Sequence, residues 1–214
     1  MNSYSLTPAM LPEIINWLVK NYVEAGGAVL GLIYIFLSIR QRIWTWPVGL
    51  LTSLLYCVVF FQSKFYADMA LQVYYVGVSI YGWYHWLRGN TGNPGKLQVT
   101  ATPRRYWLPL LVVSLLLFLL ISFVLKTFTD SPVPVGDGFT TAFSLTATWM
   151  LARKYLEHWL IWVVVDLLSA VLYATKDLWA TVLLFAVYTG MAVAGYLEWK
   201  KELTNRTQPT YSIE

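Results

Sequence analysis

Long apolar runs recur along almost the whole of this sequence, and they constrain its fold more than any other feature. A helix needs roughly 20 mainly apolar residues to cross the hydrocarbon core of a bilayer. The 214-residue chain shows this pattern seven times, at 21–40, 44–62, 66–87, 106–126, 138–153, 158–175 and 178–199. We therefore predict an all-α membrane protein with seven transmembrane helices.

The composition supports this fold class and excludes others. The chain is 57% hydrophobic and 12% charged, whereas an average soluble domain has roughly 25% charged residues. Its net charge of +4 does not indicate a nucleic-acid partner, because the basic residues flank apolar runs and form no patch on a soluble domain. The single cysteine, Cys57, permits neither a disulfide nor a thiolate metal site. We expect membrane lipid around the chain, and neither a metal nor a cofactor.

The basic residues predict the orientation, because short loops rich in Lys and Arg stay in the cytoplasm. Eleven of the 15 fall on one side of the predicted membrane: Arg40, Arg42, Arg88, Lys96, Arg104, Arg105, Arg153, Lys154, Lys200, Lys201 and Arg206. The N-terminus should be outside and the C-terminus inside. This places residues 1–20 in an extracytoplasmic segment, 88–105 in a cytoplasmic loop and 200–214 in a cytoplasmic tail.

The chain also matches itself without gaps at an offset of 113 residues. The matched pairs include Arg40 with Arg153, Trp46 with Trp159, Tyr75 with Tyr188, Gly82 with Gly195 and Trp86 with Trp199. This offset places 21–87 on 138–199 with the helices in the same direction, and transporters use such parallel repeats to form a central site. The apolar helix 106–126 has no counterpart and should link the halves while facing lipid. The predicted plan is three plus one plus three helices.

Asp166 lies in the middle of the apolar run WLIWVVVDLLSA. A carboxylate at this depth costs at least about 2.5 kcal/mol, and such residues generally face a cavity or a partner. Trp159, Trp162 and Asp166 have the spacing i, i+3, i+7, which places them within about 60° on one helical face. Because aromatic rings attract cations, this face suits a cationic aromatic solute. The alternatives are an interfacial position for Trp159 and a contact between helices for Asp166.

Further polar groups at bilayer depth are weaker candidates for the substrate site. They are Gln72, Tyr75, Ser53 and Thr148. Ser and Thr in membrane helices more often bond a backbone carbonyl or a neighbouring helix than a ligand. The amide of Gln72 is not satisfied in this way, and Ser53 is the repeat mate of Asp166. His85 and His158 are expected at the membrane interface, where they make no metal cluster.

The chain shows no sign of ATP use or of enzymatic catalysis. It has no GxxxxGK[ST] phosphate loop, no H-E-x-x-H motif and no Ser/His/Asp arrangement. We therefore expect a passive facilitator that is not an enzyme. The alternatives are an integral-membrane enzyme acting on lipid or prenyl substrates, and a sensor that binds the solute without moving it.

Two stretches, 46–86 and 151–179, resemble the Pnu-type vitamin transporter family. The second contains Trp159, Trp162 and Asp166, which match the family's W-x-x-W-x-x-x-N/D signature. The resemblance implies a seven-helix facilitator of the PnuC type in the bacterial inner membrane. Its parallel three-plus-one-plus-three plan would resemble a full-length SWEET fold, and the three signature residues would line the substrate site.

The same resemblance implies a substrate and a partner. It implies uptake of an unphosphorylated vitamin, nicotinamide riboside, which a cytoplasmic vitamin kinase then traps. By the resemblance, nicotinamide riboside members of the family tend to have a glutamine at the position of Thr148, so thiamine, the substrate of PnuT-type members, is the alternative. The sequence leaves a homo-oligomer open.

Overall fold

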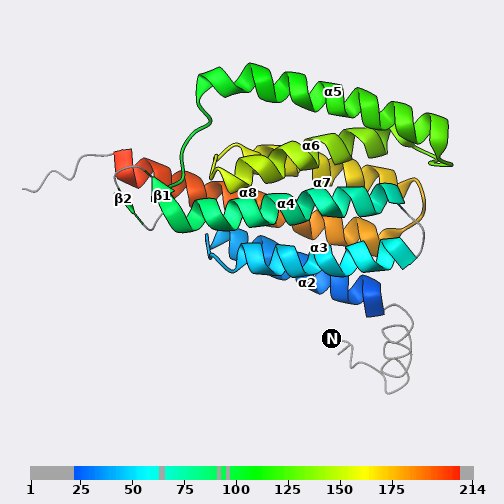
Figure 1. The fold of residues 1–214 in the computed structure, drawn as a ribbon, viewed down its shortest axis with the longest axis horizontal. Helices are drawn as coiled ribbons and strands as arrows, with labels where there is room; N and C mark the ends of the chain where they lie inside the picture. Colours follow the sequence, from blue (N-terminus) through cyan, green and yellow to red (C-terminus); the bar gives the residue numbers. More distant parts are fainter. Residues whose placement is uncertain (1–21, 63–65, 91–92, 95–96, 208–214) are drawn as a thin grey trace, which may run out of the picture.

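The computed structural model is a bundle of helices that run roughly along one common direction (Figure 1). It describes residues 22–62, 66–90, 93–94 and 97–207, so the predicted segment 1–20 lies outside the described residues. The helices are α2 (Tyr22–Ile39), α3 (Thr45–Gln62), α4 (Tyr66–Arg88), α5 (Arg104–Phe128), α6 (Pro134–Ala152), α7 (His158–Ala174) and α8 (Trp179–Thr207). Two short strands, β1 (Gly89–Asn90) and β2 (Asn93–Pro94), pair antiparallel after α4. The prediction of seven helices is confirmed for the described residues.

The outer surface of the bundle is apolar. Among the described residues, α3, α5 and residues Trp179–Arg206 of α8 are long and apolar enough to cross a membrane, and Gly26–Ile39 and His158–Ala174 are shorter apolar stretches. Large apolar side chains cover α5 from end to end, including Leu108, Leu111, Leu116, Leu119 and Phe123, all of them exposed. Water would solvate such a surface poorly, whereas lipid tails match it.

The internal repeat is visible in the helix boundaries. The last residues of α2 and α6, the first residues of α3 and α7, and the first residues of α4 and α8 all differ by 113. The colour ramp of Figure 1 shows that each pair of matching helices runs in the same direction. Gln41 and Lys154, again 113 apart, both adopt positive φ angles of 51° and 53° in the turns that follow α2 and α6. The predicted parallel repeat is therefore confirmed.

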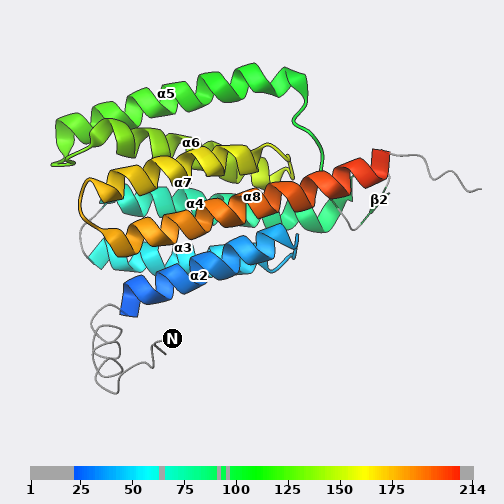
Figure 2. The same cartoon turned by 180° about the vertical axis from the view of Figure 1, so that it is seen from behind.

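The two repeats pack against each other through two equivalent interfaces. Helix α4 packs on α6, and α2 packs on α8, as Figures 1 and 2 show from opposite sides. Superposing each repeat on the other converts the α4–α6 contact into the α8–α2 contact, as an approximate two-fold axis along the bundle requires. Helix α5 packs beside α6 on the outside, where the hydroxyls of Ser114 and Thr146 lie 2.7 Å apart. It lies where a lipid-facing linker was predicted.

Matched tryptophans form the core at one end of the bundle. The edge-to-face ring pairs are Trp46–Trp86 (5.3 Å, 88°) and Trp159–Trp199 (5.6 Å, 90°). Glycine makes room for each pair. A Cβ atom on Gly82 would lie 2.4 Å from the ring of Trp46, and one on Gly195 would lie 2.6 Å from the ring of Trp159. Trp159 is only 3% exposed, so the interfacial alternative for this residue does not hold.

Two helix ends differ from the prediction. Helix α6 begins at Pro134 rather than at residue 138, because proline is well tolerated in the first turn, where its missing N–H has no partner to lose. Helix α8 continues to Thr207 instead of ending near residue 199. Its polar final turns include the ion pair Glu202–Arg206 at i, i+4 spacing, which stabilises a helix outside the apolar region.

The connection predicted as an extended loop at 88–105 is partly buried. Leu97 and Val99 belong to the tryptophan core. The backbone of Thr100 pairs with the turn before α7: its N–H donates to Lys154 O (3.1 Å), and its carbonyl accepts from Leu156 N–H (2.9 Å). The described part of this connection therefore covers one end of the helical bundle.

Candidate functional site

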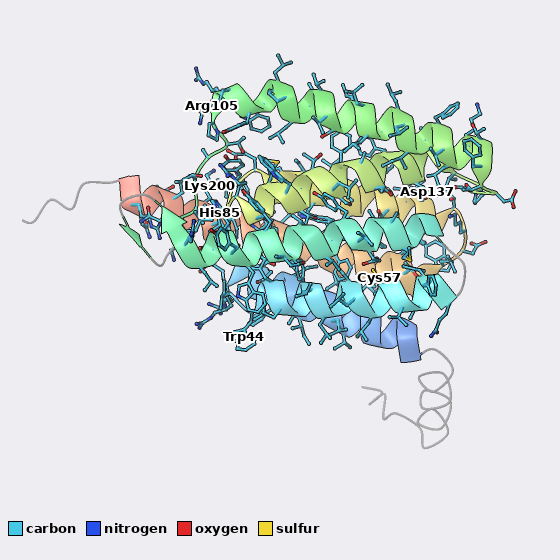
Figure 3. All side chains as sticks on the ribbon, viewed as in Figure 1. Trp44, Cys57, His85, Arg105, Asp137 and Lys200 are labelled. Carbon is cyan, nitrogen blue, oxygen red and sulfur yellow. The ribbon has the colours of Figure 1, made fainter. Side chains whose placement is uncertain are left out.

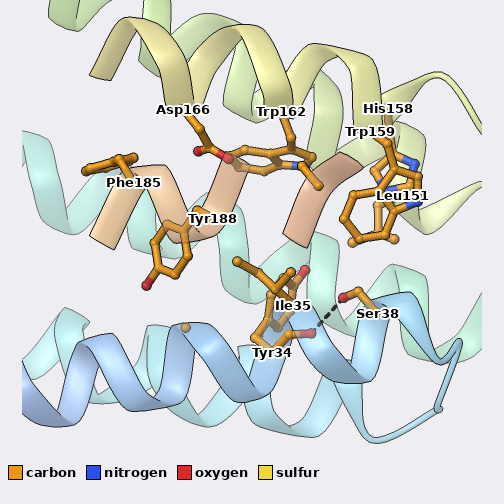
Figure 4. Close-up of a pocket in the computed structure, with 12 residues that line it drawn as sticks. Tyr34, Ile35, Ser38, Leu151, His158, Trp159, Trp162, Asp166, Phe185 and Tyr188 are labelled. Carbon is orange, nitrogen blue, oxygen red and sulfur yellow. Dashed lines mark hydrogen bonds between the residues drawn. The ribbon is translucent and has the colours of Figure 1, made fainter. Parts of the chain in front are cut away.

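A cavity of about 200 Å³ lies between the two repeats and is called the central cavity here. Helices α2, α7 and α8 form most of its wall, and the residues used below are Tyr34, Ser38, His158, Trp162, Asp166 and Tyr188. Figure 4 shows Trp162 and Asp166 projecting from α7 toward Tyr34 of α2 and Tyr188 of α8. Aromatic faces and one carboxylate therefore enclose the same space.

Two further cavities adjoin this one at Trp162. The first, of about 250 Å³, is lined by Ser53, Gln72, Tyr75, Thr148 and Trp162. The second, of about 290 Å³, is lined by Tyr75, Asp137, Trp162, Asp166 and Lys176. Trp159 lines the central cavity, so each of the seven predicted ligand residues lines at least one of these three cavities, which share Trp162.

One of these cavities, the one lined by Asp137 and Lys176, extends toward one end of the molecule. Figure 3 shows Asp137, which lines this cavity together with Lys176, at one end of the bundle. Arg105 and Lys200 lie at the other end, which we call the basic end. At the basic end the tryptophan core and the buried Leu97 fill the interior.

Asp166 is the principal charge of the central cavity. Helix α7 places Trp162 and Asp166 four residues apart, one turn along the same face. Asp166 is 4% exposed, and no ion pair within the described residues involves it. Because a buried carboxylate without a counter-charge is unfavourable, this arrangement favours a ligand that carries a positive charge.

The two repeats contribute unequally to this site. Gly49 occupies the position of Trp162 in the first repeat, and Ser53 occupies the position of Asp166. A Cβ atom on Gly49 would lie 2.9 Å from the ring of Tyr34, so the first repeat has no room for a second large side chain here. The pseudo-symmetry therefore supplies one binding region with one charge instead of two equivalent sites.

The weaker candidates differ in what their polar groups can offer. Thr148 is buried, and its hydroxyl donates to the carbonyl of Ser144 on its own helix (2.8 Å), so only its oxygen lone pairs can meet a ligand. Gln72 and Tyr75 come from α4 and line the same cavity as Trp162 of α7. These two side chains can approach a solute from the first repeat.

Sequence reasoning missed several residues of the central cavity. Tyr188 could have been found, because it is the repeat mate of the candidate Tyr75. Tyr34 gave no such signal, since its mate is Ala147. His158, which was predicted at the membrane interface, is fully buried inside the protein, with the rings of Trp159 and Trp199 at 4.5 and 4.9 Å.

Comparison with known proteins gives consistent matches over most of the chain. The sequence model described as "Nicotinamide mononucleotide transporter" matches residues 21–201. The "Nicotinamide riboside transporter PnuC" of Escherichia coli (strain K12) is 28% identical over 203 residues, which covers 84% of this chain and 85% of that protein. The "Riboflavin/roseoflavin transporter RibM" of Streptomyces davaonensis is 27% identical over 177 residues, covering 81% of this chain and 82% of the relative.

A solved structure shares the fold. The crystal structure of the vitamin B3 transporter PnuC superposes with a TM-score of 0.68 at 24% sequence identity, covering 93% of this chain and 89% of that one. The arrangement of helices described above is therefore one that an experimentally determined transporter also adopts.

Proposed function

Since this chain belongs to the nicotinamide mononucleotide transporter family, we propose that it carries nicotinamide riboside across the bacterial inner membrane by facilitated diffusion. It is a multi-pass membrane protein of a family that transports vitamin-type substrates, and it is not an enzyme. A cytoplasmic vitamin kinase would trap the solute after entry and so drive net uptake.

The single observation that carries the substrate proposal is the buried carboxylate of Asp166 beside Trp162 in the central cavity. Nicotinamide riboside has a cationic aromatic ring, which the carboxylate and the indole faces both attract. Riboflavin, which the relative RibM carries by name, is neutral and would leave Asp166 uncompensated. Thiamine is a second candidate, since it too is a cationic aromatic.

The distribution of charge and cavities supports a conformation whose cavity faces the outside. By the positive-inside tendency, the basic end of the bundle would face the cytoplasm. The cavity lined by Asp137 and Lys176 lies toward the opposite end, and the tryptophan core fills the basic end. This arrangement corresponds to a carrier that receives its solute from outside before its cytoplasmic end opens.

The first test is titration calorimetry of the purified protein with nicotinamide riboside, thiamine and riboflavin. We expect micromolar or tighter binding of nicotinamide riboside, and at least tenfold weaker binding by Asp166→Asn, which corresponds to about 1.4 kcal/mol. The matched control is Asp130→Asn, an exposed carboxylate outside the cavities. Binding of riboflavin alone, or equal binding by Asp166→Asn, would contradict the proposal.

A measurement of solute flux distinguishes a carrier from a sensor that binds the solute without moving it. Proteoliposomes should take up radiolabelled nicotinamide riboside to equilibrium without ATP. Enclosing a vitamin kinase with ATP in the lumen should extend accumulation beyond that level. Binding without flux would identify a sensor.

A further inference from the structure

Helix α2 has a glycine at the point where it meets a tyrosine of the second repeat. A Cβ atom on Gly31 would lie 2.4 Å from the hydroxyl oxygen of Tyr188 and 3.3 Å from Cζ, the ring carbon that carries this hydroxyl. Such a separation is far shorter than van der Waals contact. Tyr188 therefore holds its position only because residue 31 lacks a side chain, which is the role that glycine serves where a backbone is closely approached.

Gly31 lies on the face of α2 that borders the central cavity. Gly31, Tyr34 and Ser38 have the spacing i, i+3, i+7 and all line this cavity, as expected for one face of a helix. Tyr188 lines the same cavity from α8, and α8 packs against both α2 and α7. The contact between Gly31 and Tyr188 is therefore part of the cavity wall.

Tyr188 lies between α2 and the carboxylate of Asp166. Figure 4 shows the side chain of Tyr188 between α7, which carries Asp166, and α2, with its hydroxyl directed toward α2. Its ring packs edge to face against Phe185 (5.7 Å, 80°), which also lines the cavity. A side chain at position 31 would push the hydroxyl away from α2, and the ring would then move into the space beside Asp166.

The symmetry-related interface has a larger residue at the equivalent position. The repeat mates of Gly31 and Tyr188 are Ser144 of α6 and Tyr75 of α4, and α4 packs on α6 as α8 packs on α2. Ser144 is buried, and it lines the cavity of about 290 Å³ together with Tyr75. Of the two interfaces, only the one that borders the central cavity has a glycine at this position.

The contact between Tyr188 and α2 is steric. Within the described residues, no hydrogen bond holds the hydroxyl of Tyr188, and the dashed line in Figure 4 joins Ser38 to Tyr34. Displacing the hydroxyl therefore breaks no hydrogen bond in the described part of the chain. Alanine itself favours the helical conformation over glycine. A methyl group at position 31 should thus move the Tyr188 side chain and leave α2 folded.

We propose that Gly31 is a positioning residue for substrate binding, because it lets Tyr188 lie against α2 and so keeps the tyrosine ring out of the space that Asp166 and Trp162 enclose. This inference rests on the proposed function and names the residue that preserves room for the cationic ring of the vitamin. The size of residue 31 acts on the substrate through Tyr188, and not by direct contact.

The test is a double-mutant cycle measured by titration calorimetry with the vitamin that the wild-type protein binds, nicotinamide riboside or thiamine. Gly31→Ala should bind this vitamin about tenfold more weakly than the wild type. In the Tyr188→Phe background, which lacks the displaced hydroxyl, the same substitution should reduce affinity by less than about threefold. An equal loss in both backgrounds, or no loss in either, would overturn the inference while leaving the proposed function intact.

The matched control is Gly26→Ala on the same helix. No atom lies within 4 Å of a Cβ atom at that position, and Gly26 lines none of the three cavities. Its affinity should equal that of the wild type. A loss as large as in Gly31→Ala would show that any alanine in this part of α2 weakens binding, and it would overturn the role of Tyr188.

Thermal unfolding establishes that each variant is folded before its affinity is compared. If Gly31→Ala alone does not fold, the comparison of Gly31→Ala/Tyr188→Phe with Tyr188→Phe decides, because the clash is relieved in both. Affinities within about threefold of each other support the inference, and a larger loss in the double variant overturns it. A wild-type protein that binds neither vitamin would overturn the proposed function and this inference with it.

Discussion

The ammonium group of Lys154 donates a hydrogen bond to the side-chain oxygen of Gln41, with Nζ and Oε1 2.9 Å apart, although the two residues are repeat mates 113 positions apart. Under a two-fold operation a residue can contact its own mate only near the axis, so this pair marks where the pseudo-axis leaves the basic end. Lys154 is 3% exposed, donates also to the carbonyl of Leu97 (2.9 Å) and lies over the Trp86 ring (4.3 Å). It joins both repeats to the connection between them.

Lys154→Met should lower the thermal unfolding temperature of the detergent-solubilised protein. The substitution keeps the length of the side chain but leaves the oxygens of Gln41 and Leu97 without this donor, which costs about 1–3 kcal/mol or roughly 5 °C. Tryptophan fluorescence follows the transition. Lys201→Met, an exposed position on α8, should shift it by less than about 1 °C, and equal shifts would show that the buried contacts contribute nothing.

Gly195→Ala and Gly82→Ala should both destabilise the protein, but only the first should weaken substrate binding. A new Cβ would press on the ring of Trp159 in one case and Trp46 in the other, and overpacking of this kind costs about 1–3 kcal/mol. Only Trp159 lines the central cavity. Thermal unfolding and calorimetry measure the two effects.

The control for this pair is Gly190→Ala on the same helix as Gly195. No atom lies within 4 Å of a Cβ atom at that position, and alanine is the better helix former. Stability and affinity should therefore remain at or above the wild-type values. A loss of affinity in Gly82→Ala as large as in Gly195→Ala would mean that general loosening of the core, not the ring of Trp159, controls binding.

Trp162→Leu should reduce affinity for a cationic vitamin by about tenfold, or about 1.4 kcal/mol, because a ring face near the cation is lost. Trp162 lines all three adjoining cavities. Trp44→Leu removes an indole that is exposed on the outside of the bundle and should leave affinity unchanged. Calorimetry on both variants decides whether the central ring contacts the ligand.

Glu157→Ala should release the connection that covers the basic end. One carboxylate oxygen, Oε2, accepts from both the backbone N–H (2.8 Å) and the hydroxyl (2.6 Å) of Thr102. Hydrogen exchange monitored by mass spectrometry should show at least about fivefold faster exchange in residues 97–102, since local opening becomes easier. The exposed Glu198 provides the control, Glu198→Ala, and unchanged exchange in Glu157→Ala would contradict the anchoring role.

Helix number, repeat and direction could be predicted from the sequence because each depends on local patterns of known length. Apolar runs define the spans, and aromatic pairs such as Trp46 and Trp159 are rare enough to reveal the offset. The burial of Leu97 and Lys154 could not be predicted in this way. Both lie in stretches that read as polar connections, and only contacts with distant residues, Trp86 among them, bury them.

Site residues could be predicted where a charge at bilayer depth costs free energy, as for Asp166, or where a signature spacing exists, as for Trp159 and Trp162. His158 escaped because a histidine at a helix start is ordinarily interfacial, and nothing local shows that two tryptophans enclose it. Tyr34 escaped because its helix carries no charge or motif. Its contacts arise from the packing of α2 against the second repeat, and the periodicity of the sequence carries no information about that packing.

Helix α5 also determines how such a chain can be assembled from smaller genes. A unit with three crossings ends on the opposite side of the bilayer from its start, so two copies fused end to end would face opposite ways. One additional crossing restores the orientation, which explains why α5 has no mate and packs mainly against α6. Two separate three-helix polypeptides could pair in parallel without it, so α5 is a topological adaptor that gene fusion requires, while the carrier itself consists of the other six helices.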